Sequence, residues 1–78
     1  MKVTIVSPER TLFTGQADGV KLPGESGRFE VLKGHAPIIS TLTRGEVTCK
    51  GDEPFSEKVK GGFAEVAQDE VNICVETC

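Results

Sequence analysis

Residues 63–78 have the sequence FAEVAQDEVNICVETC and form the longest stretch of the chain without glycine or proline. Within it, Val71, Ile73 and Val75 occupy alternate positions, which is the two-residue period of a strand with one buried face. Before Gly62, glycine and proline leave no uninterrupted stretch longer than seven residues, whereas an ordinary helix needs about 11. The chain is therefore predicted to be all-β.

Apolar and polar residues alternate in the first third of the chain, and this alternation shifts by one residue at a single point. Phe13 and Ala17 share one parity, whereas Val20 and Leu22 share the other, so the slip falls on the Asp-Gly pair at residues 18–19. Asp-Gly is a strong signal for a hairpin turn, but one extra residue in a β-bulge gives the same slip. We favour a bulge in one long bent strand and keep the hairpin as the alternative.

Turn-forming residues predict two hairpins in the middle of the chain. The sequence PGESG at residues 23–27 has the chemistry of a tight turn. Further on, Val47 and Cys49 lie on one face of a short strand, and residues 55–60 are expected to return as its neighbour. Both segments are therefore predicted to be antiparallel strands.

The last third of the chain completes the strand count. Gly61 and Gly62 are expected to separate one strand from the next, at residues 63–67, and residues 68–69 are expected to turn into the final strand. About eight to ten short strands with such spacing are typical of a small β-sandwich or flattened barrel. Residues 1–78 are predicted to form this single domain.

Composition and charge limit the classes of function. The chain has 78 residues and a formal net charge of −3 with no basic run, which argues against nucleic acid because phosphate binding needs clustered lysine and arginine. The acidic excess lies after Ile39, which predicts an acidic, solvated surface there. The N-terminus is too short and too polar for a signal peptide, and no apolar run is long enough to span a membrane.

The three cysteines and the single histidine are the residues best suited to bind a metal ion or to take part in catalysis. Cys49, Cys74 and Cys78 are odd in number and show no repeated spacing, which favours free thiols in a reducing, cytoplasmic compartment. A zinc site made by His35 and the thiols is an alternative, but Cys49 and Cys74 are predicted to point to different faces. We expect His35 to lie in a loop, and we expect no catalytic, metal or cofactor site.

Five short blocks of sequence carry a family resemblance. They are IVSPE at residues 5–9, LFTG at 12–15, VKLPG at 20–24, GHAPI at 34–38 and GGFAEV at 61–66. In order and spacing they resemble the N-terminal β-sandwich domain of the epsilon subunit of F-type ATP synthases. Each block is weak alone, but together they extend over nearly the whole chain.

The resemblance implies a non-catalytic rotor subunit of the central stalk. Such a subunit links the gamma subunit to the c-subunit ring and so couples proton flow to ATP synthesis. A peripheral location on the cytoplasmic face of the bacterial inner membrane is also implied, without a cofactor. By position, the residues that face gamma would be Ser7, His35 and Ser40. Those that touch the ring would be Glu25, Ser26, Gly27 and Arg28.

The sequence departs from the family pattern in places. Arg28 stands where an acidic or small residue is common, Glu30 where glycine is common, and Lys33 where proline is common. An arginine that faces the ring favours an acidic ring loop. Many members continue into a two-helix hairpin that restrains rotation or binds ATP, whereas this sequence ends at Cys78, so we expect a natural short form without those activities.

A rival hypothesis from a different class is a free-standing β-barrel that binds a small ligand. That function requires an apolar cavity inside the barrel, and the low aromatic content of 5% makes it less favoured. The packing of the interior distinguishes this rival from the stalk subunit.

Overall fold

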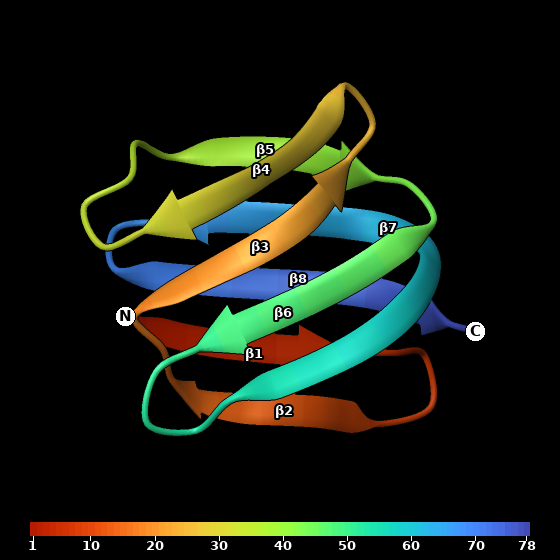
Figure 1. Cartoon of the computed structure of the whole chain (residues 1–78), viewed down its shortest axis with the longest axis horizontal. Coiled ribbons are helices and arrows are strands. Elements are labelled where there is room, and N and C mark those ends of the chain that lie inside the picture. The colour runs from red at the N-terminus through yellow and green to blue at the C-terminus, as the bar shows by residue number, and fades with distance from the viewer.

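The computed structural model describes all of residues 1–78 and consists of strands, turns and loops. The prediction of an all-β chain is confirmed. Two layers are visible in Figure 1, where β3, β4 and β6 cross in front of β5, β8 and β1. The strands are β1 (Lys2–Val6), β2 (Thr11–Gln16), β3 (Gly19–Gly24), β4 (Gly27–Leu32), β5 (Ile38–Leu42), β6 (Gly45–Lys50), β7 (Phe55–Ala67) and β8 (Glu70–Thr77).

The first sheet has the strand order β2-β1-β8-β7-β5. Its central pair, β1 and β8, is parallel, with Val3 beside Val71 and Ile5 beside Ile73. The other pairs are antiparallel. The alternation seen in the sequence therefore places the apolar residues of both central strands on one side of the sheet.

The second sheet is formed by β4, β3, β6 and the first half of β7, all antiparallel. The predicted tight turn lies between β3 and β4, where Gly27 has a φ of 131°, a conformation that favours glycine. The hairpin predicted from Val47 and Cys49 is the β6–β7 pair. A single backbone pair, Gly24 with Leu42, also joins β3 to β5.

Strand β7 belongs to both sheets, and this corrects one prediction. Gly61 and Gly62 were expected to separate two strands, but β7 continues through them with an irregular register between Val59 and Gly61. Gly62 has a φ of 147°, and a Cβ there would overlap the carbonyl oxygen of Cys74. The two glycines therefore let one long strand bend around the core rather than end.

The parity slip at residues 18–19 marks a corner between the sheets. β2 pairs with β1, whereas β3 pairs with β4 and β6, so the hairpin alternative is wrong. The predicted bent path is present, but Ala17 and Asp18 leave the strand conformation instead of forming a bulge within a ladder. The amide of Asp18 donates to the carbonyl of Lys50 at 2.8 Å, which anchors the corner.

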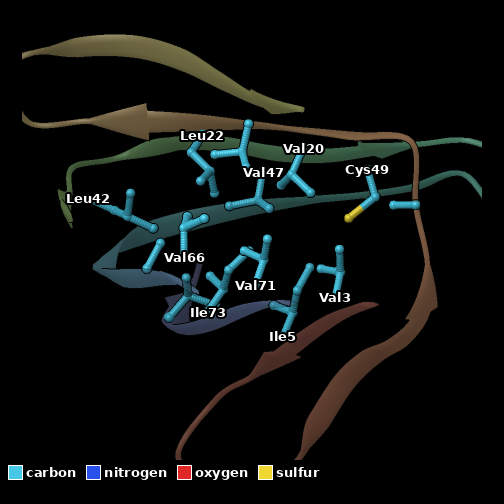
Figure 2. Close-up of a cluster of buried hydrophobic side chains, with 14 of the residues drawn as sticks. Val3, Ile5, Val20, Leu22, Leu42, Val47, Cys49, Val66, Val71 and Ile73 are labelled. Atoms are coloured by element: carbon cyan, nitrogen blue, oxygen red, sulfur yellow. The ribbon is translucent and has the colours of Figure 1, made fainter. Parts of the chain in front are cut away.

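The core lies between the two sheets and is built from 15 buried hydrophobic residues, with no buried polar or charged residue. Figure 2 shows valine, leucine and isoleucine side chains from both layers filling this space. The ligand-binding barrel requires an apolar cavity at this place, so the packing does not favour that rival. Burial also raises the pKa of the Cys49 thiol to about 11 because the interior disfavours the thiolate.

Candidate interaction surfaces

The thiols and His35 are not gathered into one site. Cys49 is 1% exposed within the core, whereas Cys74 faces the outer side of the first sheet, opposite the buried Ile73. Cys78 is exposed at the end of the chain. No group of three or more histidine, cysteine, aspartate or glutamate residues is placed to hold a metal ion, and no helix of the structure could cross a membrane.

Ser7 lies in a turn immediately after β1. Its hydroxyl is 3.3 Å from the carbonyl oxygen of Arg10, to which it donates, and it accepts from the amide of Arg10 at 3.3 Å. The backbone amide of Ser7 donates to the same carbonyl at 2.8 Å. These bonds are local to the turn and fix the position of Ser7 beside an apolar groove.

The groove beside Ser7 has a volume of about 390 Å³. Its residues come from the end of β1, the bend of β7 and the end of β8. Phe63, which is 50% exposed, is one of the hydrophobic residues that line it. The lining residues are Val6, Ser7, Pro8, Gly61, Gly62, Phe63, Cys74, Val75 and Glu76.

Phe63 is a candidate contact residue that the sequence analysis missed. The signal was available, because Ala64 and Val66 are buried on β7 and the two-residue period then directs Phe63 to the opposite side. An exposed aromatic residue on a sheet face is a common anchor in protein interfaces.

His35 lies in the loop between β4 and β5, as predicted. Its Nδ1 is 2.7 Å from the carbonyl oxygen of Ala36, and since a carbonyl only accepts, this contact requires the proton on Nδ1. The loop forms a hollow with Gln68 and Asp69 of the β7–β8 turn. In Figure 1 this loop and the end of β1 lie at opposite sides of the molecule, so His35 and Ser7 do not share a site.

Ser40 lies on β5, paired with Ala64 of β7, and its hydroxyl donates to the carbonyl of Thr41 at 3.3 Å. It borders a hollow that also contains Glu25, Ser26 and Gly27 of the β3–β4 turn. The amide of Glu25 donates to the carbonyl of Thr41 at 3.0 Å, which ties that turn to β5. The structure thus brings one predicted gamma residue next to three predicted ring residues.

Arg28 directly follows Gly27, but it does not border the hollow that contains the other three predicted ring residues. Its guanidinium Nη1 donates to the carbonyl of Glu46 at 2.8 Å across the outer side of the second sheet. On the same side, Lys50 Nζ lies 2.7 Å from Glu30 Oε2. The hydrogen bond from Lys50, helped by the charges of Lys50 and Lys21, holds the pKa of Glu30 below its ordinary value.

Comparison with known families gives one match over the whole chain. Residues 1–78 match the model of the beta-sandwich domain of the ATP synthase delta/epsilon chain. The ATP synthase epsilon chain of Caulobacter vibrioides is 43% identical over 94% of this chain and 86% of its own length. The chloroplastic epsilon chain of Chlamydomonas reinhardtii is 42% identical over 94% of this chain, but only 57% of its own length is covered. The chain thus spans little more than half the length of some of the relatives that it matches.

Solved structures with the same fold come from mitochondrial ATP synthases. A chain from the central stalk and c-ring of the Tetrahymena thermophila enzyme aligns with a TM-score of 0.80 and 14% identity, over 96% of this chain and 62% of that one. A chain from the Euglena gracilis enzyme aligns with a TM-score of 0.83 and 20% identity, over 94% of this chain and 48% of that one. At such identities the likeness establishes the fold.

Proposed function

Because the chain belongs to the ATP synthase delta/epsilon family through its beta-sandwich domain, we propose that it is a non-catalytic subunit of the central stalk of an F-type ATP synthase. It links the gamma subunit to the c-subunit ring and so helps couple proton flow to ATP synthesis. The observation that carries this proposal is the 43% identity with an ATP synthase epsilon chain over 94% of this chain.

The architecture suits a part that transmits force. A fully apolar core between two sheets, with β7 continuous through both, resists the sliding of one sheet over the other. The loops and outer faces are then free to serve as contact surfaces on a rigid scaffold. As part of the assembly, the subunit would be peripheral to the cytoplasmic face of a bacterial inner membrane.

The predicted contacts remain proposals and are distributed over several sites. Ser7, His35 and Ser40 are proposed to face gamma, which requires an interface that extends along β5 and β1 rather than one compact pocket. The ring contact is proposed at the β3–β4 turn, through Glu25, Ser26 and Gly27 with Arg28 beside them.

Calorimetric titration of this chain into the gamma subunit of the same organism tests the proposal. We expect one-to-one binding that His35→Ala weakens by up to about tenfold, because contact residues of this kind contribute on the order of 1 kcal/mol. Ser40→Ala should have a smaller effect, and Ser56→Ala, which removes an exposed hydroxyl from the second sheet, should have none. Absence of binding between folded proteins would refute the stalk assignment.

The ring contact has a separate test. The complex of this chain with gamma should co-sediment with detergent-solubilised c-ring, and Glu25→Lys should reduce the bound fraction if the turn touches the ring. Glu53→Lys, an equal charge change in the exposed β6–β7 turn, is the matched control. Equal effects of the two variants would contradict a specific contact at residues 25–28.

A further inference from the structure

Two strands of the sandwich, β2 and β4, each pair with a single strand. The free edge of β2 lies beside the β6–β7 hairpin, because the rings of Phe13 and Phe55 are 5.0 Å apart. A Cβ at Gly15 would also lie 2.9 Å from the carboxylate of Glu53. By contrast, β4 is the outermost strand of the front layer in Figure 1, and a Cβ at Gly27, where β4 begins, would meet no atom within 4 Å. The free edge of β4 is therefore open to another chain.

The backbone groups of Arg28 and Glu30 point toward this open edge. Successive residue pairs of an antiparallel ladder alternately exchange two hydrogen bonds and none. Pro23, the partner of Arg28, has no N–H, and its carbonyl accepts from the amide of Thr43 on the other side of β3. Arg28 thus belongs to a pair without hydrogen bonds, and the two-residue period gives Glu30 the same orientation. Each of the two residues therefore presents one backbone donor and one acceptor outward.

The side chains of β4 do not protect its edge from a copy of itself. Edge strands are commonly protected by proline, by a bulge or by charge, but β4 contains no proline and its ladder with β3 has no register shift. Its two charges, Arg28 and Glu30, are of opposite sign. Arg28 uses Nη1 for the carbonyl of Glu46, and Glu30 uses Oε2 for Lys50. A guanidinium has five N–H donors and a carboxylate has a second oxygen, so both side chains can take a further partner.

We propose that β4 pairs antiparallel with β4 of a second copy of this chain, with Arg28 of each copy opposite Glu30 of the other. This register pairs every outward backbone group of the two residues and places two opposite charges side by side, twice over. The next register, with Arg28 opposite Leu32, would place the two Glu30 carboxylates opposite each other. It would also need the carbonyl of Leu32, which already accepts from the amide of His35 at 3.0 Å.

The pairing has a consequence for the β3–β4 turn. In the proposed register Ser26 of one copy falls opposite Leu32 of the other, so the second copy lies against the turn that we propose as the ring contact. The dimer is therefore a form of the free subunit, and the assembled enzyme contains one copy. This consequence rests on the proposed function, whereas the self-pairing itself does not.

Sedimentation equilibrium of the chain over a range of concentrations tests the self-association. We expect a monomer–dimer equilibrium with a midpoint between about 10 µM and 1 mM, because one six-residue edge is a small interface. Amide hydrogen exchange, followed by NMR, locates the contact. The amides of Arg28 and Glu30 should exchange more slowly as the concentration rises, whereas the amides of β2, the other edge strand, should not change.

Charge exchange tests the register. Arg28→Glu or Glu30→Arg alone should raise the dissociation constant of the dimer by about tenfold or more, because the two-fold symmetry applies each like-charge contact twice. The two substitutions together should restore the wild-type constant to within about threefold. Lys58→Glu, an equal charge change on β7 of the same sheet, is the matched control and should change the constant by less than about twofold. Thermal unfolding shows that each variant is folded.

Three results would overturn the inference. They are a wild-type chain that stays monomeric at about 1 mM, a dimer in which the amides of Arg28 and Glu30 exchange as in the monomer, and single substitutions that the double exchange does not rescue. None of them bears on binding to gamma, so the stalk assignment would stand. Absence of gamma binding would refute that assignment and leave the self-pairing of β4 unaffected.

Discussion

The two sheets of the sandwich each expose a large apolar side chain to a similar extent, Phe63 at 50% and Leu32 at 49%. Their surroundings differ. Leu32 lies beside the ion pair of Lys50 and Glu30, whereas Phe63 shares a groove with Glu76, which forms no ion pair. Exposed apolar area alone therefore does not distinguish the two faces, but unpaired charge next to it does.

The largest effect on stability is expected from a substitution on the buried side of the first sheet, compared with one on its exposed side. Ile73→Ala removes a side chain that is 1% exposed and should destabilise the protein by about 2–5 kcal/mol. Ile39→Ala, on the outer side of β5, should change stability by less than about 0.5 kcal/mol. Urea unfolding measures both, and equal losses would contradict the assignment of inner and outer sides.

The bend that joins the two sheets gives the next largest effect. Gly62→Ala should destabilise by about 2–4 kcal/mol, because an unfavourable φ and overlap with the Cys74 carbonyl act together. Gly27→Ala has a similar φ with open space around it, so its loss should be about 1–2 kcal/mol. Thermal or urea unfolding of both variants separates the cost of the backbone conformation from the cost of the steric overlap. A smaller loss of stability for Gly62→Ala than for Gly27→Ala would argue against a continuous β7.

The reactivity of the cysteines compares the core with the surface, because Cys49 is buried whereas Cys78 is exposed. Burial raises the pKa of Cys49 to about 11, so at pH 8 its thiol is protonated as well as inaccessible. Iodoacetamide should therefore modify Cys74 and Cys78 in the native protein and reach Cys49 only in denaturant. Mass spectrometry of the labelled peptides reports this, and rapid native labelling of Cys49 would contradict the core described here.

The smallest effect is expected at the ion pair between Lys50 and Glu30 on the second sheet. Lys50 holds the pKa of Glu30 below its ordinary value of 4.5, so this pair stabilises the fold above about pH 4.5, and the contribution is lost as the pH falls through the lowered folded-state value. Glu30→Gln should therefore flatten the acid side of the stability profile slightly. Urea midpoints of the wild type and of Glu30→Gln at pH 7 and pH 3 give the comparison, and an equal fall in both proteins between the two pH values would contradict a stabilising ion pair.

Local sequence pattern was sufficient for much of the fold. Val71, Ile73 and Val75 alternate because β8 is buried on one side, and the β3–β4 and β6–β7 turns carry the expected residues. The bend in β7 could not be predicted in this way, because Gly61 and Gly62 have the same composition as a break between strands. Their role depends on the carbonyl of Cys74, a contact with a strand that comes later in the chain.

The candidate sites were less accessible to sequence reasoning. The resemblance gave positions such as Ser7 and His35, but the fold places these two at opposite ends. Phe63 was predicted to lie in a strand. Its exposure follows from the burial of its neighbour Ala64, because adjacent residues of a strand point to opposite sides. Charge pairing across strands, such as Lys50 with Glu30, depends on a register that one sequence does not specify.

Intact-mass spectrometry of the ATP synthase, purified through a tag on its gamma subunit, tests the assignment most directly. We predict that this chain is present at one copy per gamma subunit, and that Phe63→Ser lowers its occupancy whereas Leu32→Ser does not. A complete, active synthase that contains gamma and the c-ring but lacks this chain would contradict the assignment.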